Sequence, residues 1–332
     1  MMMKTLKHWK KRHALLLAGS CALLGLLPVG ALAGDDDDSS DDRYEHGANI
    51  CGKTTSQLLK ACRFEARDDA TVESAVCLNV RDRFASETCL QAARTARTEA
   101  LARCVEIKQA RNDVCAKLGT GPYDPVIDPA NFVAGINNRY TPFPPGAFRV
   151  YEKKTAAGLE RIRVEVLPET RVIQGVTVTT LRDTVFRNGV LIEDTKDWLA
   201  QDRQGNVWYM GEIVQNFEEG LLANLNGSFE AGKNSAKAGY WSTAFPQVGD
   251  FYRQEWSLNN AEDVVEVVSL DARDTTVPFS QYATGPILKV RATTPLSPSE
   301  VEFKYYVPGV GFALEVKPAT GERLELVDFG PR

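Results

Sequence analysis

The sequence predicts an α+β protein in which a disulfide-stapled antiparallel helical hairpin is followed by a large antiparallel β half-barrel or barrel. Two observations predict this fold class. Six cysteines lie in or beside a helix-forming stretch without proline or glycine, residues 53–118, and apolar residues recur with a period of two from about residue 148 onwards. Proline and glycine are concentrated between the two patterns, at residues 119–146.

Composition argues against several classes of function. The 332 residues include 39 Lys and Arg against 44 Asp and Glu, so the chain lacks the basic surplus with which proteins bind nucleic acid, and we expect no such partner. His8, His13 and His46 are the only histidines. A histidine-based zinc site, a Ser-His-Asp triad and a Cys-His pair are therefore not expected, and we predict no metal and no cofactor.

Residues 1–33 have the pattern of a secretory signal peptide. A basic region without acidic residues precedes an apolar run, Ala14–Ala33, that ends in Ala31-Leu32-Ala33. We expect cleavage after Ala33 and export to the periplasm or the extracellular space, with no stable membrane span in the mature chain. Two alternatives remain open: the run is long enough to stay as a membrane anchor, or Cys21 is lipid-modified. Cleavage removes five basic residues and no acidic one, which changes the formal charge from −5 to −10.

Residues 34–48 are expected to be an acidic, disordered linker. They contain six aspartates within eight residues, Asp35–Asp42, and no apolar side chain among these eight. Clustered carboxylates also attract hard cations, but the glycine and terminal glutamate of an EF-hand loop are missing.

The six cysteines after residue 33 predict a disulfide framework, since an even number of cysteines in an exported segment normally pairs. Their intervals are 11, 15, 12, 15 and 11 residues, which is a symmetric spacing; the cysteines are Cys51, Cys62, Cys77, Cys89, Cys104 and Cys115. Redox or metal-binding cysteines are the alternative, although the segment contains no CxxC motif and no histidine.

Helix geometry then restricts the pairing. Eleven residues of helix separate two Cα atoms by about 16 Å, whereas a disulfide requires less than about 7 Å, so sequence neighbours cannot pair within one helix. A hairpin over residues 49–119 that turns near residues 81–86 permits the nested pairs Cys51–Cys115, Cys62–Cys104 and Cys77–Cys89. A helix break is expected at residues 68–71, with Asp69 or Thr71 capping a second helix, and it would shift the phase of the cysteines. We expect the hairpin to act as a rigid spacer or lid, with a protein partner.

Residues 120–146 are expected to be a linker, and residues 147–332 an antiparallel β domain. Apolar and polar residues alternate in several runs separated by turn-forming residues, which is typical of half-buried strands. Strands are predicted at residues 161–166, 176–186, 191–199, 207–215, 251–258, 264–270, 287–292, 300–307, 312–316 and 324–327. About ten strands suit a curved sheet, half-barrel or barrel.

Two motifs in this domain carry a resemblance. The segment Asp197–Glu212 has the pattern DWxAQDxxGNVWYxGE, and Lys304–Gly311 has the pattern KYYxPGVG. With these motifs, residues 140–330 resemble a family of uncharacterised secreted bacterial proteins. More distantly, the domain is similar to the half-barrels of lipoprotein carriers, which enclose acyl chains. The resemblance implies no catalytic residues.

Aromatic side chains are the candidate ligand-binding residues, because flat amphipathic rings suit a lipid-like or glycan-like ligand. They are Trp198, Trp208, Tyr209, Trp241, Trp256 and Tyr306. Ordinary core packing is the alternative for each of them.

Three carboxylates are the candidate catalytic residues, namely Glu212, Glu255 and Asp197. Strand alternation predicts that Glu212 shares a face with Trp208 and Met210, where burial would raise its pKa and suit general acid–base catalysis. An ion pair across the sheet or exposure to solvent is the alternative. Asp202 and Asn206 are expected to stabilise their own turn rather than to bind calcium.

Together these patterns predict an exported binding or scaffold protein whose β domain holds a hydrophobic or amphipathic ligand. The lack of a nucleophile–histidine motif favours a non-enzymatic function. Two alternatives remain open: a carboxylate-dependent glycan hydrolase or lyase, and a structural or adhesion protein of the cell envelope.

Overall fold

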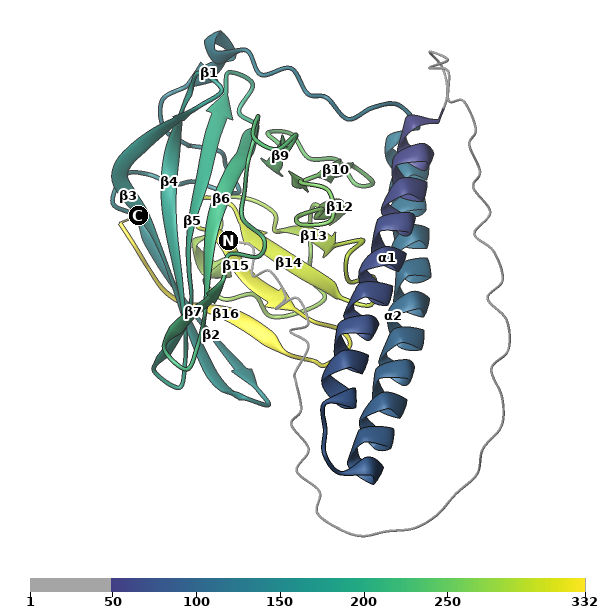
Figure 1. Cartoon of the computed structure of the whole chain (residues 1–332). Helices are drawn as coiled ribbons and strands as arrows, with labels where there is room; N and C mark the ends of the chain where they lie inside the picture. The colour runs from purple at the N-terminus through teal and green to yellow at the C-terminus, as the bar shows by residue number, and fades with distance from the viewer. Residues whose placement is uncertain (1–48, 332) are drawn as a thin grey trace. The chain divides into compact units, whose positions relative to one another are not determined.

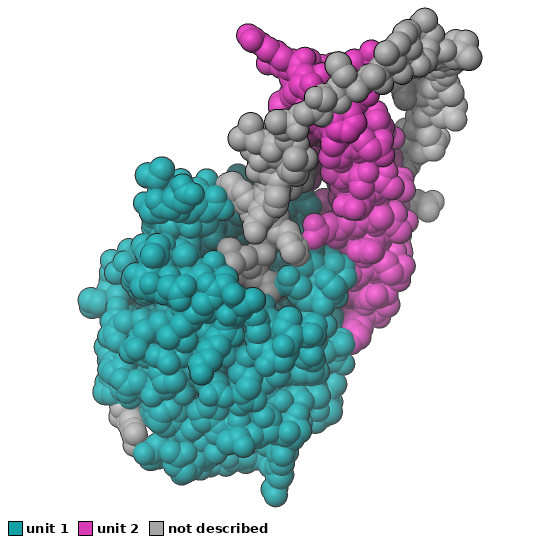
Figure 2. Space-filling view, turned by 90° about the horizontal axis from the view of Figure 1, so that it is seen from below, with its two compact units in different colours: residues 1–7, 123–332 teal, residues 8–122 magenta. Residues whose placement is uncertain are grey.

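The structure is a computed structural model that describes residues 49–331. The described chain divides into two compact units between residues 122 and 123 (Figure 2). The predicted signal peptide and acidic linker lie outside the described residues. Among the described helices, none combines the length and the apolar character needed to cross a membrane.

The unit that ends at residue 122, magenta in Figure 2, is a two-helix hairpin. Helix α1, Ile50–Leu78, and helix α2, Arg83–Leu118, pack side by side in Figure 1 and are joined by a short turn. Each helix begins with a side-chain cap, because the side chains of Asn49 and Asp82 accept hydrogen bonds from backbone N–H groups of the first turn.

Three disulfides link the two helices with the predicted nested connectivity. Cys51 pairs with Cys115, Cys62 with Cys104 and Cys77 with Cys89, with Cα–Cα distances of 5.8, 5.8 and 5.4 Å. The prediction is confirmed, and its basis is geometric: an antiparallel pair of helices brings symmetric positions together along its whole length.

The predicted helix break at residues 68–71 is wrong, since α1 is continuous through this segment. The hydroxyls of Thr71 and Ser74 donate to the carbonyl oxygens of Arg67 and Ala70, each four residues earlier. This back-bonding lets Thr and Ser remain inside a helix. The phase of the cysteines is therefore maintained from one end of the hairpin to the other.

The unit that begins at residue 123, teal in Figure 2, is a sixteen-stranded sheet in which every pairing is antiparallel. Its strands are β1 Phe132–Val133, β2 Phe148–Thr155, β3 Gly158–Ile173, β4 Val176–Arg187, β5 Val190–Asp202, β6 Val207–Glu218, β7 Leu221–Asn224, β8 Phe229–Glu230, β9 Lys237–Ser242, β10 Phe251–Arg253, β11 Glu255–Trp256, β12 Val264–Ser269, β13 Leu288–Thr293, β14 Val301–Val307, β15 Gly311–Val316 and β16 Arg323–Gly330.

The sheet curls into a nearly closed β barrel (Figure 1), which confirms the predicted fold class. The order of paired strands starts at β10 and ends at β11, and only Gln254 separates these two strands in the sequence. Since β10 pairs with β12 and β11 pairs with β9, the segment 251–256 joins the two ends of the sheet. We call this segment the seam.

The barrel wall buries apolar side chains on both faces. The main core lies inside the barrel and includes Tyr151, Ile162 and Leu181 from adjacent strands. A smaller cluster around Trp198 and Trp208 lies on the outer face of β4, β5, β6 and β9. The segment expected as a linker contributes to both clusters, with Ile136, Tyr140 and Phe143 in the first and Ile127 and Phe132 in the second.

Candidate functional site

A β-bulge between β5 and β6 decides which side chains enter the barrel. Trp198 pairs with Gly211 and Leu199 with Tyr209, so Met210 is an additional residue on β6. Gly211 has a φ of 145°, and a Cβ atom there would lie 2.4 Å from the Phe229 carbonyl oxygen. Only glycine fits this position, and the bulge depends on it.

The bulge reverses the predicted face of Glu212. Glu212 pairs with Asp197, which lies two residues from Leu199 and therefore on the same, inward face of β5. Glu212 thus faces into the barrel, whereas Trp208 and Met210 lie on the outer face. The predicted face was wrong because one extra residue changes the phase of a period-two pattern. Glu212 is nevertheless buried, at 4% exposure, so the alternative of exposure to solvent does not hold.

Carboxyl groups line the inner face of β4, β5 and β6. Asp183 on β4 is directly opposite Thr195, and Asp197 on β5 is opposite both Leu181 and Glu212. Glu193 is half-buried on the same face, opposite Val185. We call Asp183, Glu193, Asp197 and Glu212 the acidic wall.

Tyr209 lies at one side of the acidic wall. Its hydroxyl donates a hydrogen bond to the Asp197 carboxylate, and its ring makes edge contacts with Phe229 and Trp241 at centroid distances of 5.3 and 4.9 Å. Burial, and then the negative charges of Asp197 and Glu255, hold the pKa of the phenol well above its usual range. Tyr209 therefore remains a hydrogen-bond donor across the physiological pH range.

The three sequence-predicted carboxylates are thus brought to one part of the structure. Asp197 and Glu212 are cross-strand neighbours, and Glu255 is fully buried and close enough to act on the pKa of Tyr209. The sequence placed these residues in separate strands and could not bring them together, because their proximity depends on the pairing of β5 with β6 and on barrel closure.

Asp183 is a candidate site residue that the sequence analysis did not identify. It is 4% exposed, and its Oδ1 atom has no hydrogen-bond partner within the described part of the chain. Burial, then the charges of Glu193 and Asp197, raise its pKa well above the usual range. The alternation Leu181, Asp183, Val185 could have placed this carboxyl on the apolar face of its strand.

A second set of charged side chains lies inside the barrel, on β2, β3, β4, β14 and β15. Lys304 contacts Glu302 at 3.2 Å and Glu315 at 3.8 Å. Glu160 contacts Lys153 at 3.4 Å and Arg187 at 2.7 Å. We call these six residues the charged ladder. Arg187 is 27% exposed, so this set reaches solvent at one end.

Two glutamates of the charged ladder have pKa values displaced in opposite directions. Burial, followed by the charge of Glu302, raises the pKa of Glu315 to about 8. Against the effect of burial, Lys304 and Lys317 hold the pKa of Glu302 below its usual range. At neutral pH Glu302 is therefore ionised, whereas Glu315 is largely protonated.

The predicted ligand-binding aromatics do not form one site. Tyr209, Trp241 and Tyr306 belong to the inner core, whereas Trp198 and Trp208 belong to the outer cluster, where Phe132 packs against Trp208 at 6.1 Å between centroids. The sixth member, Trp256, is half-buried beside Tyr123 at 6.0 Å.

Asp202 stabilises its own turn, as predicted. Its Oδ1 atom accepts hydrogen bonds from the backbone N–H groups of Gln204 and Asn206, both at 2.9 Å. Its Oδ2 atom accepts from Asn206 Nδ2 and Trp208 Nε1, also at 2.9 Å. The conspicuous polar motif at residues 202–208 is thus explained by local structure.

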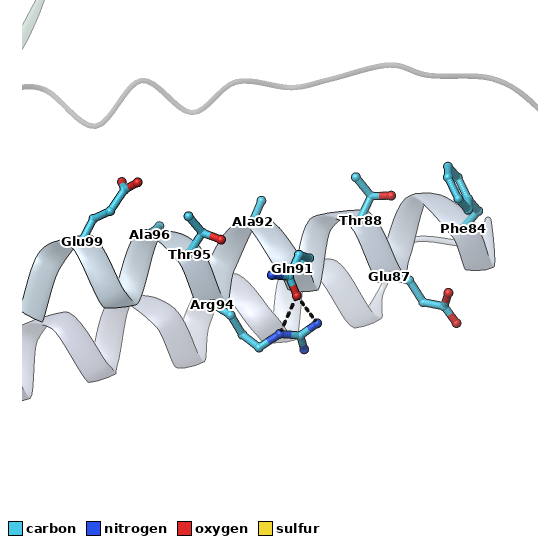
Figure 3. A pocket seen from close by; sticks show the side chains of 9 residues that line it. All are labelled: Phe84, Glu87, Thr88, Gln91, Ala92, Arg94, Thr95, Ala96 and Glu99. Atoms are coloured by element: carbon cyan, nitrogen blue, oxygen red, sulfur yellow. Dashed lines mark hydrogen bonds between the residues drawn. The ribbon is translucent and has the colours of Figure 1, made fainter. Parts of the chain in front are cut away.

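Two features of the hairpin, a groove on α2 and a group of potential metal ligands, do not form a functional site. A groove on α2 is lined by side chains that project from one helix, shown in Figure 3; they are Phe84, Glu87, Thr88, Gln91, Ala92, Arg94, Thr95, Ala96 and Glu99. Within residues 49–331, the group spaced to hold a metal ion is Glu73 with Cys77 and Cys89. Both of these cysteines are joined in a disulfide, so neither supplies a thiolate.

Comparison with known proteins yields little. No family model and no curated protein matches the chain. Among solved structures, the chain is similar to a candidate lipoprotein from Parabacteroides distasonis, with 10% sequence identity and a TM-score of 0.29, over 58% of this chain and 99% of that one. A likeness at this level carries no argument about function.

Proposed function

We propose that the protein is an exported binding protein whose β barrel holds a small amphipathic ligand in its interior. The observation that carries this proposal is the acidic wall with Tyr209, a set of buried polar groups inside a nearly closed barrel. The interior of a small barrel is normally filled by side chains, and burying polar or charged groups there is costly. Buried titratable groups with displaced pKa values concentrate at functional sites.

Export is supported by the three disulfides of the hairpin, because disulfides persist in oxidising compartments. The signal peptide expected at residues 1–33, with cleavage after Ala33, would direct the chain to such a compartment. The hairpin, a long and thin element that has little apolar core of its own, gains stability from these covalent links.

The ligand is proposed to be amphipathic rather than wholly apolar. Asp197 and the hydroxyl of Tyr209 lie next to the rings of Phe229 and Trp241. An acyl chain alone would leave the Oδ1 atom of Asp183 without a hydrogen-bond donor, which costs about 1–3 kcal/mol. A ligand with one polar and one apolar part satisfies both kinds of side chain.

Native and denaturing mass spectrometry of the protein purified from its own host tests this function. We expect a co-purifying mass in the native spectrum that is lost on denaturation. Tyr209→Phe keeps the ring and removes the hydroxyl, and should reduce the bound fraction at least several-fold. Tyr282→Phe, on a residue that is 42% exposed, is the control. A bare chain in every preparation, and no binding of added lipids, glycans or amines, would contradict the proposal.

An enzyme is a second candidate, favoured by the opposite pKa displacements of Glu302 and Glu315. A pair of carboxyl groups in which one is ionised and the other protonated at neutral pH can act as base and acid. Glu302→Gln and Glu315→Gln should each lower any glycan turnover by at least 100-fold. Turnover that survives both changes would exclude this pair, and the same test with Glu212→Gln and Glu255→Gln applies to the carboxylates chosen from sequence.

A further inference from the structure

We propose that the ligand of the barrel is an aliphatic amine, held in its ammonium form by the acidic wall with Asp183 as the principal contact. This inference rests on the proposed function and specifies the chemical class of the ligand. Its basis is the register of β4, β5 and β6, together with the burial of Asp183 and the lack of a hydrogen-bond partner for its Oδ1 atom.

Strand register places the acidic wall on one continuous surface. Asp183 and Thr195 are directly opposite, and Asp197 is two residues further along β5 and opposite Glu212 on β6. Directly opposite residues in antiparallel strands have Cβ atoms about 5 Å apart. Carboxyl groups from three adjacent strands therefore face the same small volume.

Asp183 is the member of this wall whose hydrogen bonding is incomplete. The side chain is 96% buried, and none of the hydrogen bonds or ion pairs described for residues 49–331 is made to its Oδ1 atom. Its position between Leu181 and Val185 on the inward face of β4 directs it into the barrel. A buried carboxyl oxygen without a donor is costly unless a ligand supplies one.

The neighbouring cations inside the barrel have other partners. Lys153 and Arg187 contact Glu160, and Lys304 contacts Glu302 and Glu315. Lys317 also contacts Glu302, at 3.4 Å. The buried Arg149 donates to the backbone carbonyl oxygens of Pro142 and Val310. Since these cations of residues 49–331 are engaged elsewhere, we infer that a ligand supplies the positive charge for Asp183.

The spacing of the carboxyl groups favours an amine over a metal ion. A divalent ion needs several oxygen ligands in one compact shell, and within the described residues no three members of the acidic wall have ligand atoms within 4.8 Å of one another. An ammonium group has three donors that point in different directions and can bridge carboxylates that lie further apart. The aromatic rings beside Tyr209 suit the hydrocarbon part of such a ligand.

Isothermal titration calorimetry of the chain from Gly34, freed of any co-purified ligand, tests the inference with spermidine and 1,4-diaminobutane as probes. The neutral 1,4-butanediol and the salts CaCl2 and MgCl2 are the comparison ligands. We expect the amines to bind and the diol not to bind. Binding at pH 7 should release protons, detected as different heats in phosphate and Tris buffers, because a nearby ammonium favours the charged form of Asp183.

Asp183→Asn and Asp194→Asn are the matched variants. Asp194 is on the adjacent strand, but its side chain pairs with Arg182 on the other face of the sheet. We expect Asp183→Asn to weaken amine binding at least tenfold and Asp194→Asn to change it less than twofold. Thermal unfolding checks that both variants are folded.

Three results would overturn the inference. They are no amine binding by the unsubstituted chain at millimolar concentration, binding of the metal salts but not of the amines, or equal amine binding by the two variants. If a neutral ligand co-purifies and its binding depends on Tyr209, the inference fails while the proposed binding function stands. If no ligand of any class binds, both fail.

Discussion

At the scale of single residues, the barrel interior contains charge where an aliphatic side chain would be expected. Lys304 and Glu315 face each other across β14 and β15, and both are almost fully buried. Where Glu315 is ionised, the two charges repay their desolvation only with very good geometry, so such pairs often stabilise less than apolar residues would. The contact of 3.8 Å between them is long for a strong pair.

Glu315 should make the stability of the barrel depend on pH. Its pKa is about 8 in the folded chain and about 4.3 in the unfolded chain. Because the folded state then binds more protons, the free energy of unfolding should fall as the pH rises from about 5 to 8, by on the order of 2–4 kcal/mol. Glu315→Gln should remove this decrease, measured by urea unfolding at several pH values.

The control for this prediction is Glu325→Gln, since Glu325 is 43% exposed and pairs with Arg323. This variant should retain the decrease in stability. Equal pH dependence in Glu315→Gln and the unsubstituted chain would show that Glu315 does not titrate in this range.

At the scale of elements, the seam depends on close approach of two backbones. A Cβ atom at Gly239 on β9 would lie 2.4 Å from the Gln254 carbonyl oxygen, which belongs to the seam. Backbone atoms cannot move aside as a flexible side chain does. Glycine at this position thus permits β9 and β11 to pair and the sheet to close.

Gly239→Ala should therefore open the seam and lower the free energy of unfolding by about 2–4 kcal/mol. Amide hydrogen exchange should increase first in residues 237–242 and 251–256. Gly121→Ala, where nothing lies within 4 Å of the added atom, is the control and should change neither quantity. Unchanged exchange in the seam of Gly239→Ala would contradict this account of barrel closure.

The disulfides of the hairpin should differ in their contributions. The central pair, Cys62–Cys104, closes a longer loop than the pair near the turn, Cys77–Cys89, with sequence separations of 42 and 12. In the loop-entropy model the longer loop restricts the unfolded chain more. Replacing the central pair with alanine should cost about 2–4 kcal/mol, and replacing the other pair less. Hydrogen exchange of α1 and α2 peptides measures both, and an inverted order would contradict the loop argument.

At the scale of the whole molecule, the chain consists of two units joined by an exposed segment. Residues 116–122 are exposed, and the division between the units falls after residue 122. Limited proteolysis with a nonspecific protease should cut here before it cuts either unit, and give a disulfide-linked fragment of the hairpin and a β-barrel fragment. First cleavage within the barrel would contradict the division.

The hairpin was predictable from sequence because its constraints are local. Helix rise excludes pairing between cysteines 11 residues apart in one helix, and the symmetric spacing then selects the nested connectivity. The mistaken break at residues 68–71 came from taking Asp69 or Thr71 as the N-cap of a second helix, whereas the Thr71 hydroxyl donates to the Arg67 carbonyl oxygen within α1.

The barrel was predictable only in part. Alternation located most strands, since a period of two depends on neighbouring residues alone. It failed at Glu212, where the bulge at Met210 changes the face, and at the seam, where the predicted strand 251–258 is divided into β10 and β11. Bulges and closure depend on partner strands that lie far away in the sequence.

The sequence by itself determined the order of the two units, the disulfide connectivity, the strand-rich second half and the expectation of export. These properties follow from helix rise, residue periodicity and the composition of the first 33 residues. Only the tertiary structure decided that the sheet closes, that Asp197, Glu212 and Glu255 meet near Tyr209, and that Asp183 is buried beside them. The physical reason is that burial and electrostatic coupling depend on distances through space, which strand pairing sets and chain order does not.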